Sequence, residues 1–273
     1  MGIWILFTAL ALQVATPGES ACLGFIRPTA VPLNLYVSGT EEDELVNYSS
    51  PGKLLYVSGP GIASVKVGEL YSVVRPEGKI RHPATGDRVG IYHKELGSVR
   101  IEAVRPDGAT ATVVSACNAI LKGDLLVTPA VRPAVEFSGK PSDALTPYPS
   151  QGLIGEIVLG KDGIKEMGAG NICFLELGSR DGVKPGDRFT IYRRQPAFDA
   201  RRLGSEGSLA GYSYKRYATG EYRALLTSSL KRRRIPPRVM GDLVVLDVQE
   251  TTSAAKIIQS RSEIHVGDIV VRR

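Results

Sequence analysis

The sequence predicts an all-β protein made of two tandem small β-barrel domains of the SH3-like kind, the second of which carries a basic insertion. The 273 residues suffice for two domains, and a composition of 43% hydrophobic and 23% charged residues excludes wholesale disorder. The 30 glycines and 17 prolines exceed the usual share and favour short strands joined by turns over long helices. A pattern of turns and alternating apolar residues also recurs along the chain.

The repeat is clearest in two stretches of equal length. Residues 97–126 and 241–270 align without a gap, and in each stretch 26 positions separate the first glycine from the second. Identical positions are Gly97/Gly241, Val104/Val248, Ala111/Ala255, Ile120/Ile264, Gly123/Gly267 and Asp124/Asp268. Upstream, residues 67–73 match residues 185–191. Two copies of one unit explain this pattern.

Each copy is predicted to consist of strands. Val99, Ile101 and Ala103 alternate with polar residues, which is the period of a strand with one buried face. A turn at 105–108 leads to a second strand at 109–114, so the pair forms a hairpin. Gly-Asp pairs close later turns, and short strands follow them at 125–127, 188–192 and 269–271. Such strands bury their apolar faces best by curling into small barrels.

The chain divides into five predicted segments. Residues 1–21 are a signal peptide, 22–51 an N-terminal extension, 52–130 the first barrel, 131–150 a linker and 151–273 the second barrel. Four prolines among serine and glycine residues make 131–150 a semi-extended linker. The second barrel is expected to open with a strand at 152–159 and another at 171–177, with a turn through Asp162 and Gly163 between them.

The first residues have the layout of an export signal. A ten-residue apolar core, Ile3 to Leu12, is followed by Pro17, Gly18 and small residues, as in a secretory signal peptide. No basic residue precedes the core, and the alternative is a buried N-terminal strand or helix. No apolar run reaches 18 residues, so no transmembrane helix is predicted. We therefore expect an exported protein of the periplasm or cell envelope.

The cysteines leave alternatives open. Cleavage near Ala21 would place Cys22 at the new N terminus, where a lipid could be attached, although Glu19 stands where a lipobox has an aliphatic residue. Cys117 and Cys173 lie in apolar stretches and are expected to pack as small hydrophobic side chains. A disulfide between Cys22 and Cys117 is the alternative in an oxidising compartment.

The two copies differ most in residues 195–240. This window holds ten basic and three acidic residues, a net charge of +7, whereas the whole chain carries +6. Cations pair with phosphates and aromatic rings stack on bases, so the window is a candidate contact surface for an anion or another partner. The candidate contact residues are Lys215, Arg216, Arg223, Lys231, Arg232, Arg233, Arg234, Tyr212, Tyr214 and Tyr217.

The partner classes follow from the compartment. For an exported protein we expect other envelope proteins, anionic envelope polymers, or lipid headgroups contacted by peripheral membrane association. Nucleic acid is a less favoured partner, because exported proteins seldom meet it. The alternative to all of these is a solvated loop whose charges keep the protein soluble. The oligomeric state is not predicted.

No catalytic residue, cofactor or metal ligand is predicted. Residues 155–161 have the spacing of a nucleotide-binding loop, but Asp162 stands where a magnesium-binding hydroxyl belongs, and 156–159 is typical of a strand. Ser228 and Lys231 match a Ser-x-x-Lys spacing that lacks its partner motifs. The three histidines, His82, His93 and His265, show no metal-ligand spacing.

We therefore expect a non-enzymatic binding protein. Two alternatives come from other classes. One is a wall-active hydrolase or transferase using the acids near Asp181 and Asp187, which also have a structural explanation as turn residues. The other is a nucleic-acid-binding protein that uses the basic insertion.

Two motifs carry a resemblance to known families. The run from Gly178 to Arg193 (Gly-Ser-Arg-Asp-Gly-Val-Lys-Pro-Gly-Asp-Arg-Phe-Thr-Ile-Tyr-Arg) resembles the small β-barrel at the C terminus of the flagellar assembly protein T family. Residues 68–76, 82–86 and 96–97 look like the barrel that accompanies peptidoglycan-binding LysM modules in bacterial envelope proteins. The likeness covers about 52–129 and 152–273.

The resemblance implies an envelope component without enzymatic activity that assembles with other proteins or with the cell wall. The chain contains no LysM module, so wall binding is not carried over. The basic insertion also has no counterpart in the family pattern.

Overall fold

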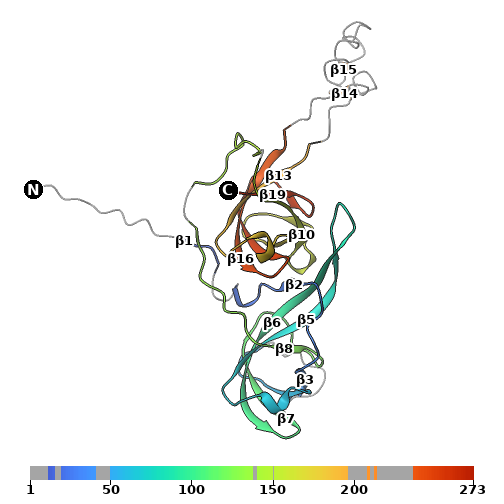
Figure 1. The fold of residues 1–273 in the computed structure, drawn as a ribbon, viewed down its shortest axis with the longest axis vertical. Coiled ribbons are helices and arrows are strands. Elements are labelled where there is room, and N and C mark those ends of the chain that lie inside the picture. Colours follow the sequence, from blue (N-terminus) through green and yellow to red (C-terminus); the bar gives the residue numbers. More distant parts are fainter. Residues whose placement is uncertain are drawn as a thin grey trace, which may run out of the picture.

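The computed structural model describes residues 12–15, 20–40, 50–137, 140–149, 151–195, 208–209, 212–213 and 236–273. Figure 1 shows two β-rich bodies, one above the other, and a long hairpin of the lower body that runs up beside the upper one. Nearly all regular structure is strand, which confirms the predicted all-β class. Among the described residues, no helix has the length and apolar character needed to cross a bilayer.

The strands of the first half are β1 (Leu12–Gln13), β2 (Phe25–Arg27), β3 (Tyr36–Thr40), β4 (Leu54–Ser58), β5 (Leu70–Arg81), β6 (Arg88–Arg105), β7 (Gly108–Ala116), β8 (Leu125–Val127) and β9 (Glu136–Phe137). Those of the second half are β10 (Ile154–Gly160), β11 (Glu166–Met167), β12 (Ile172–Leu175), β13 (Arg188–Arg193), β14 (Ser208–Leu209), β15 (Tyr212–Ser213), β16 (Arg238–Val248), β17 (Ser253–Ser260), β18 (Ile264–His265) and β19 (Ile269–Arg272). Short 3₁₀ helices are η1 (Ile62–Ser64), η2 (Lys161–Gly163) and η3 (Ser179–Asp181).

The second half forms a closed six-stranded barrel. Its strands follow the order β10-β12-β17-β16-β13-β19, and each neighbouring pair is antiparallel. Phe189 and Ile191 on β13 and Leu243 and Val245 on β16 are fully buried in its core. The two-residue spacing of these side chains places them on the same face of each strand, as the strand period requires.

The first half forms a seven-stranded sheet in the order β2-β6-β5-β8-β3-β4-β7, in which β6 also pairs with β7. Each strand of this sheet except β2 has an equivalent in the barrel of the second half. The strands β5, β6, β7, β4, β3 and β8 correspond, in this order, to β13, β16, β17, β12, β10 and β19. With this correspondence, every neighbouring pair of strands in one half has its equivalent in the other. Strand β2 is the additional member of the first sheet and pairs with β6 alone. The core of this half is an aliphatic cluster that includes Leu55, Val99 and Ile101.

The predicted extension and linker belong to the folded body. Strand β3 lies inside the first sheet, paired with β4 and β8, although it precedes the predicted start of the first barrel at residue 52. In the linker, Ser142 is buried, and its backbone N–H and its hydroxyl donate to Asp242 of β16 at 2.5 and 2.7 Å. These bonds hold the linker against the second half, so it is not a free spacer.

The Gly-Asp pairs close turns as predicted. Gly123, Gly186 and Gly267 have φ values of +92°, +91° and +92°, which only glycine adopts without strain. The aspartate after each glycine accepts a hydrogen bond from the backbone N–H three residues earlier, at 2.6 Å for Asp124 and 2.8 Å for Asp268.

An arginine–aspartate pair recurs at equivalent places in the two halves. The guanidinium of Arg75 donates through Nε and Nη2 to both carboxylate oxygens of Asp124, at 2.7 and 2.8 Å. Arg193 donates in the same way to Asp268, at 2.7 Å for both bonds. In each case Nη2 also donates to a backbone carbonyl oxygen, at 3.0 and 2.7 Å respectively. Each pair therefore ties one strand, β5 or β13, to the turn that precedes its neighbour, β8 or β19.

Candidate functional site

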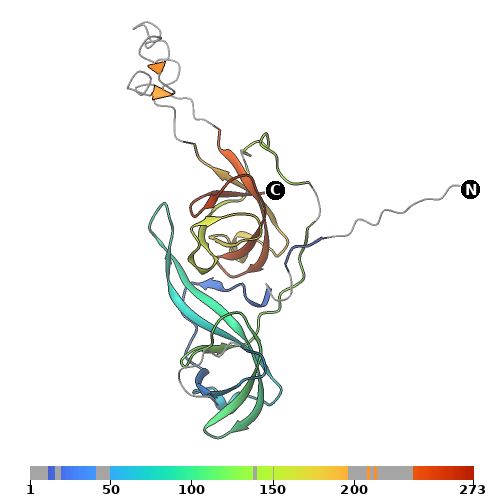
Figure 2. The ribbon, with the colours of Figure 1, turned by 180° about the vertical axis from the view of Figure 1, so that it is seen from behind.

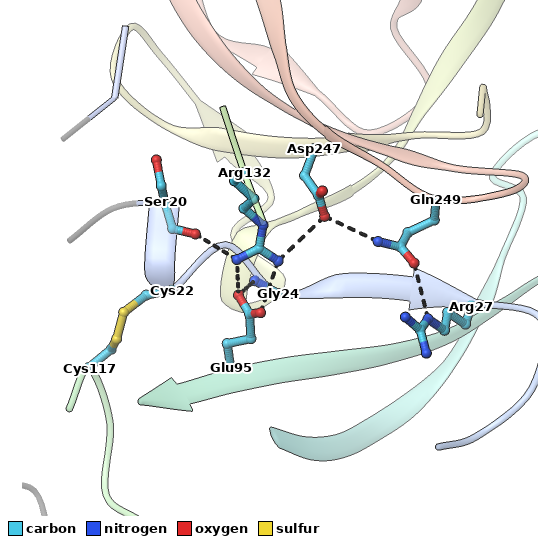
Figure 3. A network of polar contacts seen from close by, with 9 residues as sticks. All are labelled: Ser20, Cys22, Gly24, Arg27, Glu95, Cys117, Arg132, Asp247 and Gln249. Atoms are coloured by element: carbon cyan, nitrogen blue, oxygen red, sulfur yellow. Dashed lines mark hydrogen bonds and ion pairs between the residues drawn. A yellow bond between two sulfur atoms is a disulfide. The ribbon is translucent and has the colours of Figure 1, made fainter. Parts of the chain in front are cut away.

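A buried polar cluster lies where the N-terminal segment, the linker and the two halves meet (Figure 3). Its centre is Arg132 of the linker, whose two terminal nitrogens each donate to a carboxylate oxygen of Glu95 at 2.9 Å. Asp247 of β16 accepts from the same guanidinium at 3.4 Å, and the Ser20 carbonyl oxygen accepts at 2.6 Å. The backbone N–H of Gly24 donates to Glu95 at 3.0 Å. Four separate segments are thus joined through one guanidinium.

The cluster extends along β2 through a second arginine. Gln249 donates to Asp247 at 3.1 Å and accepts from Nε of Arg27 at 3.0 Å. The Arg27 guanidinium lies 4.7 Å from the centroid of the Phe25 ring, within range of a cation–π interaction. Strand β2 is therefore held to the second half by side chains as well as to β6 by its backbone.

Burial makes the central ion pair structurally important. The side chains of Arg132 and Glu95 are only 7% and 2% exposed. Burial opposes the charge of Arg132, but the hydrogen bonds and charges of Glu95 and Asp247 outweigh it and raise the pKa of Arg132. Removing either partner would leave the other buried side chain without its counter-ion.

A disulfide fixes the N-terminal segment beside this cluster. Cys22 is bonded to Cys117, 95 residues away, and the backbone N–H of Cys117 donates at 2.7 Å to the carbonyl oxygen of Leu96. Cys22 precedes Gly24 and Leu96 follows Glu95, so the covalent link and the ion pair constrain the same two segments. Cys173 is a free, buried thiol, as its apolar surroundings predict.

Strand β2 also joins the two halves through its apolar residues. Phe25 packs with Val74 and Leu125 of the first sheet. Its neighbour Ile26 belongs to a different cluster, which includes Phe174 of the second half. Successive side chains of a strand point to opposite faces, so three residues of β2 can contact both halves at once.

The part of the β5–β6 hairpin that extends beyond β7 and β8, residues 75–94 and hereafter the arm, packs on the second half. Figures 1 and 2 show it beside the barrel from opposite sides. Near its base the Tyr92 and Phe174 rings meet edge to face, with centroids 5.2 Å apart, and Lys94 pairs with Asp162 at 3.0 Å. At its tip, Nε2 of His82 lies 2.8 Å from Glu176.

The hydrogen bonds around His82 define its tautomer. Its Nδ1 atom accepts from the backbone N–H groups of Ala84 and Thr85 at 3.1 and 3.2 Å, so the proton lies on Nε2 and is donated to Glu176. Burial of Glu176, opposed by His82 and reinforced by Glu156, raises the pKa of its carboxyl group. No group of three side chains suited to a metal is present in the described ranges.

His93 is the other histidine of this junction. It is fully buried and stacks on Phe25 with ring centroids 4.9 Å apart. Its Nε2 atom accepts from the Val31 N–H at 3.1 Å, and Nδ1 lies 3.0 Å from the Ile91 carbonyl oxygen, so the proton lies on Nδ1. Burial lowers the pKa of His93, against the raising effect of the Ile91 carbonyl. The neutral ring is a structural link between residue 31 and β6.

No protein-family model matches the chain, and no curated protein matches it either. The interpretation of this junction therefore depends on its own geometry. The cluster joins the N-terminal segment, the linker and both halves, and each of its carboxylates has a hydrogen-bond partner. We therefore interpret it as a structural contact that holds the two halves together.

The contact residues predicted in the insertion lie outside the described residues, except for Tyr212. Tyr212 lies in β15, whose backbone pairs with β14, and its side chain is not described. The others are Lys215, Arg216, Arg223, Lys231, Arg232, Arg233, Arg234, Tyr214 and Tyr217.

The acids considered for a catalytic role are engaged in turns. Asp181 accepts from the Gly178 N–H at 2.8 Å, and Asp187 accepts from the Lys184 N–H at 3.0 Å. The segment with nucleotide-loop spacing is strand β10 followed by η2, as its apolar residues predict.

Proposed function

We propose that the protein is an exported envelope protein without enzymatic activity, which acts as a rigid binding module in flagellar or cell-wall-associated assembly. The assembly role comes from the family resemblance. The module consists of two copies of one SH3-like barrel. The shared order of strand pairs and the recurring Arg75–Asp124 and Arg193–Asp268 pairs support the duplication.

The observation that carries the proposed compartment is the Cys22–Cys117 disulfide. Disulfides persist in oxidising compartments such as the periplasm, whereas the cytosol keeps thiols reduced. The same pairing favours an unmodified Cys22 over lipidation, because one sulfur atom cannot carry both bonds. Cleavage after Ala21 would remove strand β1, the buried Val14 and Ala15, and the Ser20 carbonyl group of the polar cluster. It would keep Gly24, Glu95, Arg132 and Asp247.

The rigid junction supports a binding role. The polar cluster, the disulfide and the arm hold the halves in one arrangement. Surfaces on both halves can therefore meet a partner without the entropic cost of ordering the halves relative to each other. The insertion is rooted in this body, because Gln195 at its start donates to the Pro236 carbonyl oxygen at 3.0 Å. Its positive charge suits anionic envelope polymers or acidic surfaces of envelope proteins.

The compartment is tested by trapping thiols in intact cells. Cells are quenched in acid, and free thiols are labelled with a mass tag before and after reduction. We expect Cys173 to be labelled after denaturation alone, and Cys22 and Cys117 only after reduction, in a fraction released with the periplasm. Free Cys22 and Cys117 in a cytosolic fraction would refute the proposal.

The binding role is tested by crosslinking in cells. Partners captured by the full chain are compared with those captured by a variant in which Lys231, Arg232, Arg233 and Arg234 are replaced by glutamine. We expect the captures to fall, since the change removes four of ten basic residues in the window. If the variant captures the same partners in the same amounts, the insertion is not part of the binding surface. If neither protein captures a partner, the proposal that the protein is a binding module is refuted.

A further inference from the structure

The segment that precedes the predicted cleavage site lies in a groove of the second half. Strand β1 pairs antiparallel with β9 of the linker, so that Gln13 lies opposite Glu136. Just beyond β1, the backbone N–H of Val14 donates to the Val135 carbonyl oxygen at 2.9 Å. Figures 1 and 2 show β1 along the side of the second half. Residues 12–15 therefore add a short extended segment to the edge of the linker.

The side chains of Val14 and Ala15 cover an apolar surface of the barrel. Both are buried in one cluster with Ile172 of β12 and with Val244 and Leu246 of β16. The residues on either side of Val244 belong to the core inside the barrel, so Val244 and Leu246 lie on its outer face. Val135 of the linker is buried in the same cluster. The groove is thus lined by the outer face of the barrel and by β9 with the residue before it.

The walls of the groove remain fixed when residues 1–21 are removed. Leu23 belongs to the same cluster and is held by the neighbouring disulfide. The linker is fixed before β9 by the ion pair of Arg132 and after β9 by the hydrogen bonds of Ser142. These contacts oppose a collapse of the groove. Cleavage therefore exposes an apolar surface and also the edge of β9, whose only strand partner among the described residues is β1.

We propose that after cleavage this groove, hereafter the strand groove, binds an extended apolar segment of another envelope protein by strand addition. The segment that it replaces specifies the partner: a main chain antiparallel to β9, with small apolar side chains at the places of Val14 and Ala15. A lipid chain can cover the apolar surface but cannot supply the N–H group that the Val135 carbonyl oxygen accepts. Before cleavage the chain's own N-terminal segment fills the groove, so only the processed protein can bind.

This inference rests on the proposed export and deepens the binding role, because it assigns a surface to a class of partner. It uses no residue of the insertion. The crosslinking of the insertion variant and the thiol trapping depend on other residues, so the proposed function can stand when the strand groove fails.

The proposal is tested on the processed protein, isolated from the periplasm with its disulfide formed. Mass spectrometry first establishes that residues 12–15 are absent. A fluorescent peptide of residues 10–17 (Leu-Ala-Leu-Gln-Val-Ala-Thr-Pro) is then titrated with the protein, and its anisotropy is measured. We expect saturable binding, and binding at least tenfold weaker to the full chain, produced in the cytosol and oxidised after purification. Retention of residues 12–15 in the periplasmic protein, no saturation, or equal binding to the two proteins would overturn the proposal.

A methylated peptide distinguishes strand addition from nonspecific apolar contact. A methyl group on the backbone nitrogen of Val14 removes the donor to Val135, and it should weaken binding about tenfold, the effect of losing one hydrogen bond of about 1.4 kcal/mol. This comparison leaves the protein unchanged, so it does not depend on the folding of a variant. Equal affinity for the two peptides would overturn strand addition.

A substitution on the barrel tests the apolar wall of the groove. Leu246→Ala should weaken binding of the unmodified peptide about tenfold, because it removes part of the surface that Val14 and Ala15 cover. The matched control is Ile154→Ala on β10 of the same barrel, since Ile154 is 44% exposed and lies outside the cluster. Affinity should change less than twofold in this control, and circular dichroism verifies the fold of both variants. Equal effects of the two substitutions would overturn the assignment of the groove.

The identity of the partner is tested by site-specific crosslinking in cells. A photoreactive amino acid replaces Glu136, which is exposed on β9 and lies opposite Gln13. Mass spectrometry of the linked peptides should locate the contact in an extended apolar segment of another envelope protein. Linkage only to a second copy of this chain, linkage only to lipid, or no linked peptide would overturn the proposal.

Discussion

Replacing Arg132 by methionine should destabilise the protein by about 3–5 kcal/mol, the cost of leaving a buried charge without its partner. Methionine retains most of the side-chain length, so the loss is mainly electrostatic. Glu95 would keep the Gly24 N–H but lose both 2.9 Å bonds to the guanidinium, at a site where it is 2% exposed. Urea unfolding monitored by far-ultraviolet circular dichroism measures the free energy of unfolding, with the disulfide kept intact.

A double-mutant cycle separates this effect from simple loss of packing. Glu95→Leu together with Arg132→Met removes both charges, and we expect it to recover most of the stability lost in the single variant, because an apolar pair can replace a buried ion pair. The matched control is Arg180→Met, which breaks an exposed pair with Glu250 and should cost less than about 1 kcal/mol. A cost below about 1 kcal/mol for Arg132→Met would refute the buried junction.

Three further predictions concern stability. Burial lowers the pKa of His93, so its contribution to the free energy of unfolding is complete above pH 6.5 and falls by about 1.4 kcal/mol per pH unit as the pH drops towards the folded pKa. The urea midpoint should therefore be lower at pH 5.5 than at pH 7.5, and His93→Gln should reduce this difference. An unchanged difference would contradict the assignment of His93 as a buried neutral ring. Replacing Cys22 and Cys117 by serine should cost about 2–4 kcal/mol in urea unfolding, and an unchanged midpoint would show that the bond is absent. Gly97→Ala should lower the thermal midpoint by several degrees, because the new Cβ would overlap the Ser115 carbonyl oxygen. In the control Gly78→Ala, the new Cβ meets nothing within 4 Å, so the midpoint should change little. Equal effects of the two substitutions would contradict the close approach of Gly97 to the next strand.

The strands and turns could be predicted because their signals are local. Alternating apolar residues place the 97–104 strand, and the Gly-Asp pairs place the turns that precede β8, β13 and β19. The repeated glycines also have a local cause that the structure identifies. Gly97 and Gly241 occupy equivalent positions in β6 and β16, where a Cβ would overlap the backbone of the next strand.

The junction could not be predicted, because its members are distant in sequence and each has an ordinary local explanation. Arg132 lies 37 residues from Glu95 and 115 from Asp247. In the sequence Arg132 is one charge in a proline-rich linker, and Glu95 is one charged residue just before the repeat that begins at Gly97. Their pairing depends on how the two halves pack, which no periodicity encodes. For the same reason the sequence alone places the extension outside the first barrel, since β3 finds its partners, β4 and β8, only in the folded sheet.

The same strand connection is lengthened in both halves, with different consequences. In the first half β5 and β6 continue past the core of the sheet to form the arm, which contacts the second half through pairs such as Lys94 with Asp162. In the second half the equivalent connection, between β13 and β16, is the insertion, and the window 195–240 carries a net charge of +7. The remainder of the chain sums to −1, since the whole chain carries +6, so it cannot neutralise this charge. The balancing anions must come from outside the chain, and attraction to them should weaken as added salt shortens the Debye length below about 10 Å.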